Sequence, residues 1–208
     1  TTLLQRLQSG NAFTIKSYSH GDSAALINAA IELDIIDLIN KHVPCGKDGT
    51  KPMRDGLTVG ASLLFAALGR ACHPTSKLGW YDWCQSTSLE YCLKGQFKDL
   101  DSQHFWDQMS ALPTEAIASI EGEIVKKLVH TYGVELDCLF FDTTNFFTFI
   151  ASDNKRCDIP QRGKNKQHRY DLRQIGMALL VSKRDHFPLF HQTYRGNKND
   201  GTLFKEIF

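Results

Sequence analysis

The stretch LFFDTTNFFTF, residues 139–149, decides the fold class of this chain. Aromatic and β-branched residues fill it, and such residues favour a strand over a helix. One acidic side chain, Asp142, stands in the middle of the run. Because an unpaired carboxylate is costly to bury in a strand, we expect Asp142 to have a partner.

Three interpretations of Asp142 compete on the residues alone. Its side chain can cap the turn that Thr143–Asn145 would form, or it can pair with a nearby arginine. It can also be a hard oxygen ligand for Mg²⁺ or Mn²⁺. The aromatic run around it does not distinguish between these interpretations.

Strand-like segments continue after this stretch. Residues 134–149, 174–182 and 187–196 are each rich in aromatic, branched and aliphatic side chains, and polar residues separate them. The last two predict a hairpin that turns over Lys183 to His186. After Gly196, Asn199 or Asp200 can act as the N-cap of a new helix.

The residues before 134 have a helical pattern instead. We predict helices over residues 23–42, 59–72, 80–93, 102–112 and 114–132. Asp22 or Ser23, Thr58, and Asp101 or Ser102 are the expected N-caps of the first, second and fourth, and Gly133 is the expected stop of the last. Helices followed by strands indicate an α+β fold, with a helical region 1–133 and a second region 134–208.

Composition narrows the class of protein. The 208 residues are 42% hydrophobic, which is enough for a core. No apolar run is long enough to span a membrane and no signal-peptide pattern opens the chain, so we expect a soluble, cytoplasmic protein without a membrane partner. The six cysteines form no CxxC pair, and we expect reduced thiols.

Positive charge is concentrated in one segment. Residues 155–184 hold nine lysines and arginines against two aspartates, a formal net charge of +7, although the whole chain carries only +1. Such a segment is typical of binding to a polyanion, and its alternative is a solvated basic loop. A metal-binding acid beside a basic segment is the combination that phosphodiester chemistry requires.

Several stretches together resemble a known family. They are His20-Gly21, ALGRACHPTSKLGWYDW (67–83), FFDTTNFF, GKNKQHRYDLRQIGMALLVS, FPLFHQTYRGN and NDGTLF. In this combination the chain from about residue 20 onward resembles prokaryotic insertion-sequence transposases of the acidic-triad (DDE) class, whose catalytic domain has a ribonuclease H-like fold. The resemblance implies that the second region is the first part of a ribonuclease H-like (α/β) domain, comprising strands 1 to 3 and the first helix. Strand 4 and the remaining two acids are then expected beyond Phe208.

The resemblance also assigns roles to residues. Asp142 falls on strand 1, where the family has its first metal-binding acid, so it implies a catalytic Asp142 with Mg²⁺ or Mn²⁺ as cofactor. Asp200 has two interpretations, a place in the catalytic site or an N-cap. Four basic residues lie where the family carries its DNA-binding stretch: Lys164, Lys166, Arg169 and Arg173.

The implied activity is DNA transposition and recombination by metal-dependent phosphodiester cleavage and strand transfer. The implied partners are the ends of the element and target DNA, and a second copy in a homodimer of the complete protein. The helical region 1–133 would then serve DNA binding or dimerisation. The alternative is a non-enzymatic DNA-binding protein derived from a truncated transposase.

Overall fold

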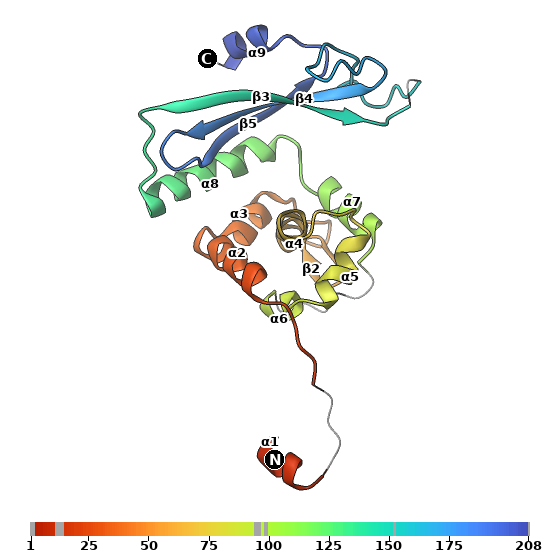
Figure 1. The fold of residues 1–208 in the computed structure, drawn as a ribbon, viewed down its shortest axis with the longest axis vertical. Helices are drawn as coiled ribbons and strands as arrows, with labels where there is room; N and C mark the ends of the chain where they lie inside the picture. The colour runs from red at the N-terminus through yellow and green to blue at the C-terminus, as the bar shows by residue number, and fades with distance from the viewer. Residues whose placement is uncertain (1–2, 11–14, 94–96, 98–99, 152, 208) are drawn as a thin grey trace. The chain divides into compact units, whose positions relative to one another are not determined.

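The computed structural model describes residues 3–10, 15–93, 97, 100–151 and 153–207. The chain divides into two compact units, residues 1–116 and 117–208, which are described separately below (Figure 1). Helices dominate the first unit, and a three-stranded antiparallel sheet with flanking helices forms the second. The mixed α+β class predicted from the sequence is therefore confirmed.

Seven helices and one short β-hairpin are described in the first unit. They are α1 (Leu3–Gln8), α2 (Gly21–Glu32), α3 (Ile35–His42), β1 (Met53–Arg54), β2 (Leu57–Thr58), α4 (Val59–Cys72), α5 (Gly79–Gln85), α6 (Leu89–Cys92) and α7 (Ser102–Ser110). Helix α4 carries the centre of the core. Its Phe65 is fully buried and packs against Phe97 and Phe105, with ring centroids 5.5 and 5.7 Å away.

Two of the predicted helices are interrupted. The helix expected over residues 23–42 is divided into α2 and α3, because Asp34 adopts a left-handed conformation with φ of 50° and ends the regular backbone there. The helix expected over residues 80–93 is divided into α5 and α6. Two predicted N-caps are confirmed: Thr58 accepts a hydrogen bond from the Ala61 amide at 3.3 Å, and Asp101 accepts one from the His104 amide at 2.8 Å.

The second unit contains the predicted strands. They are β3 (Leu139–Thr148), β4 (Arg173–Ser182) and β5 (Pro188–Arg195), in the spatial order β3-β4-β5 with antiparallel pairing throughout. Strand β3 pairs along its full length with β4, from Leu139 opposite Ser182 to Thr148 opposite Arg173. The hairpin over Lys183 to His186 is confirmed. Among the described residues, β3 has a paired neighbour on one side and is an edge strand.

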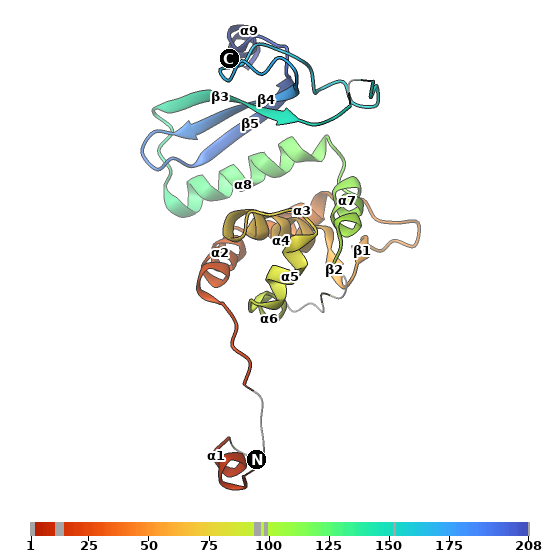
Figure 2. The same ribbon diagram turned by 45° about the vertical axis from the view of Figure 1, so that its right-hand side comes forward.

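One helix lies on each face of this sheet (Figure 2). Helix α9 (Asp200–Ile207) buries Leu203 against Ala178 and Tyr194, and its Phe204 ring meets Phe141 edge-on at 5.4 Å. A side chain at Gly176 would overlap the Tyr194 ring, so glycine is needed in the middle of β4.

Helix α8 (Ala116–Tyr132) packs on the other face. Its Glu121 carboxylate accepts hydrogen bonds from the backbone amide and from Nδ1 of His191 on β5, at 2.8 and 2.5 Å. Tyr132 stacks on Phe187 with ring centroids 5.8 Å apart. These contacts explain why α8 belongs with the sheet, whereas the sequence placed the boundary at residue 134. None of the described helices combines the length and apolar character of a membrane span.

Candidate nucleic-acid interface

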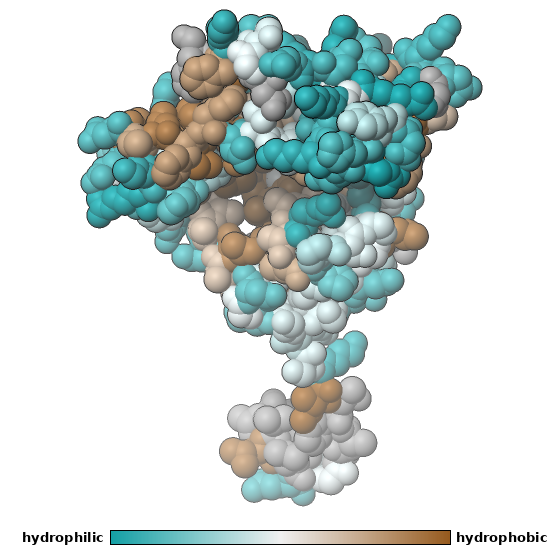
Figure 3. Space-filling model, turned by 45° about the horizontal axis from the view of Figure 1, so that its top comes forward, coloured by the Kyte–Doolittle hydropathy of each residue, from teal (hydrophilic) through white to brown (hydrophobic). Residues whose placement is uncertain are grey.

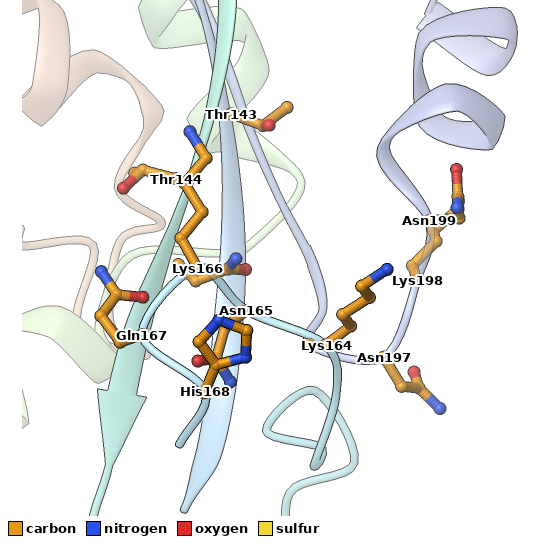
Figure 4. Close-up of a pocket in the computed structure, with 12 residues that line it drawn as sticks. Thr143, Thr144, Lys164, Asn165, Lys166, Gln167, His168, Asn197, Lys198 and Asn199 are labelled. Carbon is orange, nitrogen blue, oxygen red and sulfur yellow. The ribbon is translucent and has the colours of Figure 1, made fainter. Parts of the chain in front are cut away.

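A polar pocket of about 410 Å³ lies beside the middle of β3 in the second unit. Three segments line it: Thr143–Asn145 of β3, Lys164–His168 of the loop between β3 and β4, and Gly196–Asn199 between β5 and α9. Figure 4 shows their lysine, amide and hydroxyl side chains around the opening. Hydrophilic side chains also cover the right-hand part of the surface in Figure 3, on the side where this loop lies.

Gln174 holds two walls of the pocket together. The backbone of Gln161 pairs with that of Gln174 on β4, at 3.0 and 2.9 Å, which fixes the end of the loop on the sheet. The Gln174 side chain is 1% exposed, and its amide nitrogen donates to the carbonyl oxygens of Lys164 and Gly196, at 3.2 and 2.7 Å. Both acceptors belong to the pocket lining.

Asn165 shapes the loop from inside. Its side-chain oxygen accepts from the Arg169 amide at 2.9 Å, and its nitrogen donates to the carbonyl oxygens of Gly163 and Arg169 at 3.2 and 3.0 Å. These bonds satisfy the polar atoms of the buried Asn165 side chain, whereas the flanking Lys164 and Lys166 are exposed. A tight turn with a satisfied interior and outward cations is suited to binding an anion.

Glycines permit the close approach of the loop to the strands. A side chain at Gly163 would overlap the carbonyl oxygen of Gly196, and a side chain at Gly196 would overlap that of Gln174. Neither overlap can be relieved by a side-chain rotation, because the opposing atoms are backbone. The geometry of the pocket therefore depends on both glycines.

The structure separates the four basic residues that the sequence singled out. Lys164 and Lys166 line the pocket, together with Lys198. Arg169 instead forms a bidentate ion pair with Asp171, in which Nε and Nη2 each lie 2.8 Å from a carboxylate oxygen. Arg173 opens β4 and donates to the Asn154 carbonyl oxygen at 3.0 Å. The Arg169 guanidinium holds the pKa of Asp171 down at about 2.

Asp142 lies in the middle of β3, opposite Leu179 of β4, and is exposed. The strand continues to Thr148, so the interpretation of Asp142 as a turn cap is wrong. Among the described residues no hydrogen bond or ion pair engages its carboxylate, so the expected arginine partner is not found either. Burial was the wrong premise, since an exposed edge-strand carboxylate is hydrated and needs no partner.

The carboxylate of Asp142 remains compatible with metal binding. It is accessible and directly precedes the β3 residues of the pocket lining, so it can supply one oxygen ligand. The described residues contain no group of three or more acidic, histidine or cysteine side chains that could hold a metal ion.

The helix after β5 is capped by Asn199. Its side-chain oxygen accepts from the Gly201 amide at 2.8 Å, and Asp200 is the first residue of α9. The interpretation of Asp200 as the N-cap is therefore wrong. The side chain of Asp200 lies outside the described part of the structure, so its catalytic interpretation stays a prediction.

Several residues of the site, including Asn165, Gln174 and Lys198, were not among the predicted DNA-binding residues. Their roles depend on contacts between segments far apart in sequence, such as Gln174 with Gly196. The glycine of the GN pair at 196 and 197 was the local signal for a close backbone approach. Comparisons of the chain with protein-family models, with curated proteins and with solved structures gave no match.

Proposed function

We propose that this chain is part of a DNA transposase of the acidic-triad class, acting by metal-dependent phosphodiester cleavage and strand transfer. The observation that carries the proposal is an exposed carboxylate in the middle of β3, directly before residues that line a pocket with three lysines. A metal-binding oxygen beside cations that hold phosphate is the arrangement that such chemistry needs.

The order of elements supports a ribonuclease H-like assignment for the second unit. A ribonuclease H-like domain begins with three strands and a helix, and carries its first acid on strand 1. Strands β3, β4 and β5 followed by α9 have this order, and Asp142 lies on the first of them. No strand of the described residues pairs with the outer edge of β3, which leaves room for a further strand beside Asp142.

The proposed roles of the residues follow from their chemistry. Lys164, Lys166 and Lys198 would bind phosphates of the DNA backbone, which fixes the position of the duplex without reading its sequence. Asp142 would hold Mg²⁺ or Mn²⁺ together with the other two acids of the triad. The metal ions, when bound, would activate the attacking water or 3′-hydroxyl and stabilise the leaving oxygen.

Catalysis is tested with Asp142→Asn in the full-length protein. We expect loss of Mg²⁺-dependent cleavage at the element ends with DNA binding retained, because the substitution removes a metal ligand and no phosphate contact. Cleavage at the wild-type rate would refute the catalytic role of Asp142. Binding without cleavage in the wild-type protein would favour the alternative of a non-enzymatic DNA-binding protein.

DNA binding is tested with Lys164→Gln/Lys166→Gln on a duplex of random sequence. Removing two phosphate contacts should weaken binding and make the slope of log K against log salt shallower by about 1.8. Lys183→Gln is the control, because Lys183 is an exposed lysine in the turn between β4 and β5, where its backbone amide donates to the carbonyl oxygen of Cys138 just before β3. Equal losses for the double variant and the control would contradict a specific role for the pocket.

A further inference from the structure

Both acidic residues of the basic segment form ion pairs with arginines. Asp158 and Asp171 are the only acids between residues 155 and 184. Asp171 binds Arg169 through both carboxylate oxygens, and Asp158 pairs with Nη2 of Arg195 on β5. Both aspartate side chains are more than half exposed, so water can solvate their carboxylates and burial does not require them to pair.

The pairing extends to the pocket itself. Lys198, which lines the pocket, pairs with Glu206 of α9. Lys164 and Lys166 differ, because among the described residues no carboxylate is paired with either ammonium group. Of these five cations, Arg169, Arg195 and Lys198 each hold a carboxylate, and Lys164 and Lys166 are open to an anion.

The Arg169–Asp171 pair has the geometry that a phosphate would need. Two parallel N–H donors of a guanidinium bind a carboxylate and a phosphate in the same way, so the two anions compete for the same atoms. The side chains of Arg169 and Asp171 are 50% and 62% exposed. An ion pair in water is weak, so a phosphate can replace the carboxylate at low cost.

We infer that Asp171 is a built-in competitor of nucleic acid at Arg169, which occupies the guanidinium until a DNA phosphate displaces it and thereby limits the affinity of the interface. This inference rests on the proposed DNA binding. Asp171 is ionised throughout the neutral range, as an exposed aspartate ordinarily is, and the Arg169 guanidinium lowers its pKa further, to about 2. The competition therefore does not depend on pH in that range. The Arg169–Asp171 ion pair thereby favours release of DNA, and it weakens binding that depends on charge alone.

The test is the affinity of Asp171→Asn for a random-sequence DNA duplex over a series of salt concentrations. Freeing Arg169 should tighten binding several-fold, because the phosphate no longer has to displace a carboxylate. It should also make the salt slope steeper by at most about 0.9, because no displaced carboxylate takes up a cation as Arg169 releases one from the phosphate. Asp137→Asn is the matched control, since it removes the same charge from an exposed residue just before β3. We expect it to change the affinity less and to leave the slope as in the wild type.

A double variant isolates the pair. In the Arg169→Gln background, Asp171→Asn should no longer tighten binding beyond the effect of Asp137→Asn, because the guanidinium that it would free is absent. The inference is overturned if Asp171→Asn and Asp137→Asn have equal effects, or if the gain persists without Arg169. Absence of DNA binding by the wild-type protein would instead overturn the proposed function itself.

Discussion

At the scale of single residues, the first unit contains a hydrogen-bonded chain of a buried serine, a buried histidine and an exposed aspartate. Nε2 of His104 lies 2.9 Å from the Ser62 hydroxyl, and Nδ1 lies 2.8 Å from the Asp55 carboxylate. These residue types also form hydrolytic triads, but here Ser62 and His104 are both 0% exposed. A hydroxyl without access to substrate is not a nucleophile, so the chain serves to hold the β1–β2 hairpin on helices α4 and α7.

We predict that His104→Phe destabilises the first unit although it keeps an aromatic ring. The Ser62 hydroxyl would lose its partner inside the core, which costs about 1–3 kcal/mol. Urea unfolding followed by tryptophan fluorescence measures this loss, because all three tryptophans, at 80, 83 and 106, belong to the first unit. The exposed His130→Phe on α8 is the control, and an unfolding midpoint unchanged in both variants would show that the chain contributes nothing.

At the scale of elements, Gly60 determines how closely α3 and α4 pack. A side chain there would overlap the carbonyl oxygen of Ile36. Asn40 of α3 reinforces the contact, since its side-chain oxygen accepts from the Gly60 amide at 2.9 Å and its nitrogen donates to Thr58 at 3.0 Å. The two helices are therefore joined by backbone proximity as well as by apolar packing.

Two glycine substitutions should consequently have opposite signs. Gly60→Ala should lower the free energy of unfolding, because the clash with Ile36 outweighs the helix propensity of alanine. Gly122→Ala in α8, where a side chain would meet nothing within 4 Å, should raise it by about 1 kcal/mol. Thermal unfolding followed by circular dichroism compares the two variants, and stabilisation by Gly60→Ala would contradict the close packing.

The elements were largely predictable from local patterns, and the site was not. Alternation and β-branched residues identified β3, β4, β5 and their hairpin, and the Thr58 and Asp101 caps followed from residue type alone. The break at Asp34 was missed because a left-handed residue leaves little trace in a hydrophobic period. Lys164 and Lys166 were singled out from the basic segment and the family resemblance together. The contacts of Gln174 depend instead on the register between distant segments, which a one-dimensional pattern does not contain.

At the scale of the whole molecule, the concentrated positive charge belongs to one of the two compact units. The segment with a net charge of +7 lies entirely within the second unit, 117–208. The same unit contains the pocket, the Gln174 hydrogen bonds that join two of its walls, and the arginine–aspartate pairs. If the proposed function holds, the second unit carries the phosphate contacts that set the dependence on salt.

A fragment of residues 113–208 should therefore bind random-sequence DNA with a salt slope close to that of the whole chain. Its start before α8 retains the Glu121 contact with His191 that ties this helix to the sheet. Fluorescence anisotropy at several salt concentrations measures the slope, and circular dichroism checks that the fragment is folded. A markedly shallower slope for the fragment would show that residues 1–112 contribute phosphate contacts of their own.

The outer edge of β3, which pairs with no strand in the described parts of the chain, also bears on how the protein behaves at high concentration. A ten-residue edge with exposed Phe140 and Phe146 is a template for strand addition between molecules, the first step toward cross-β aggregation. Asp142 is the only charge along this edge, so it also acts as a gatekeeper against such stacking. A variant that neutralises Asp142 can thus lose activity by precipitating, and light scattering must accompany every assay of it.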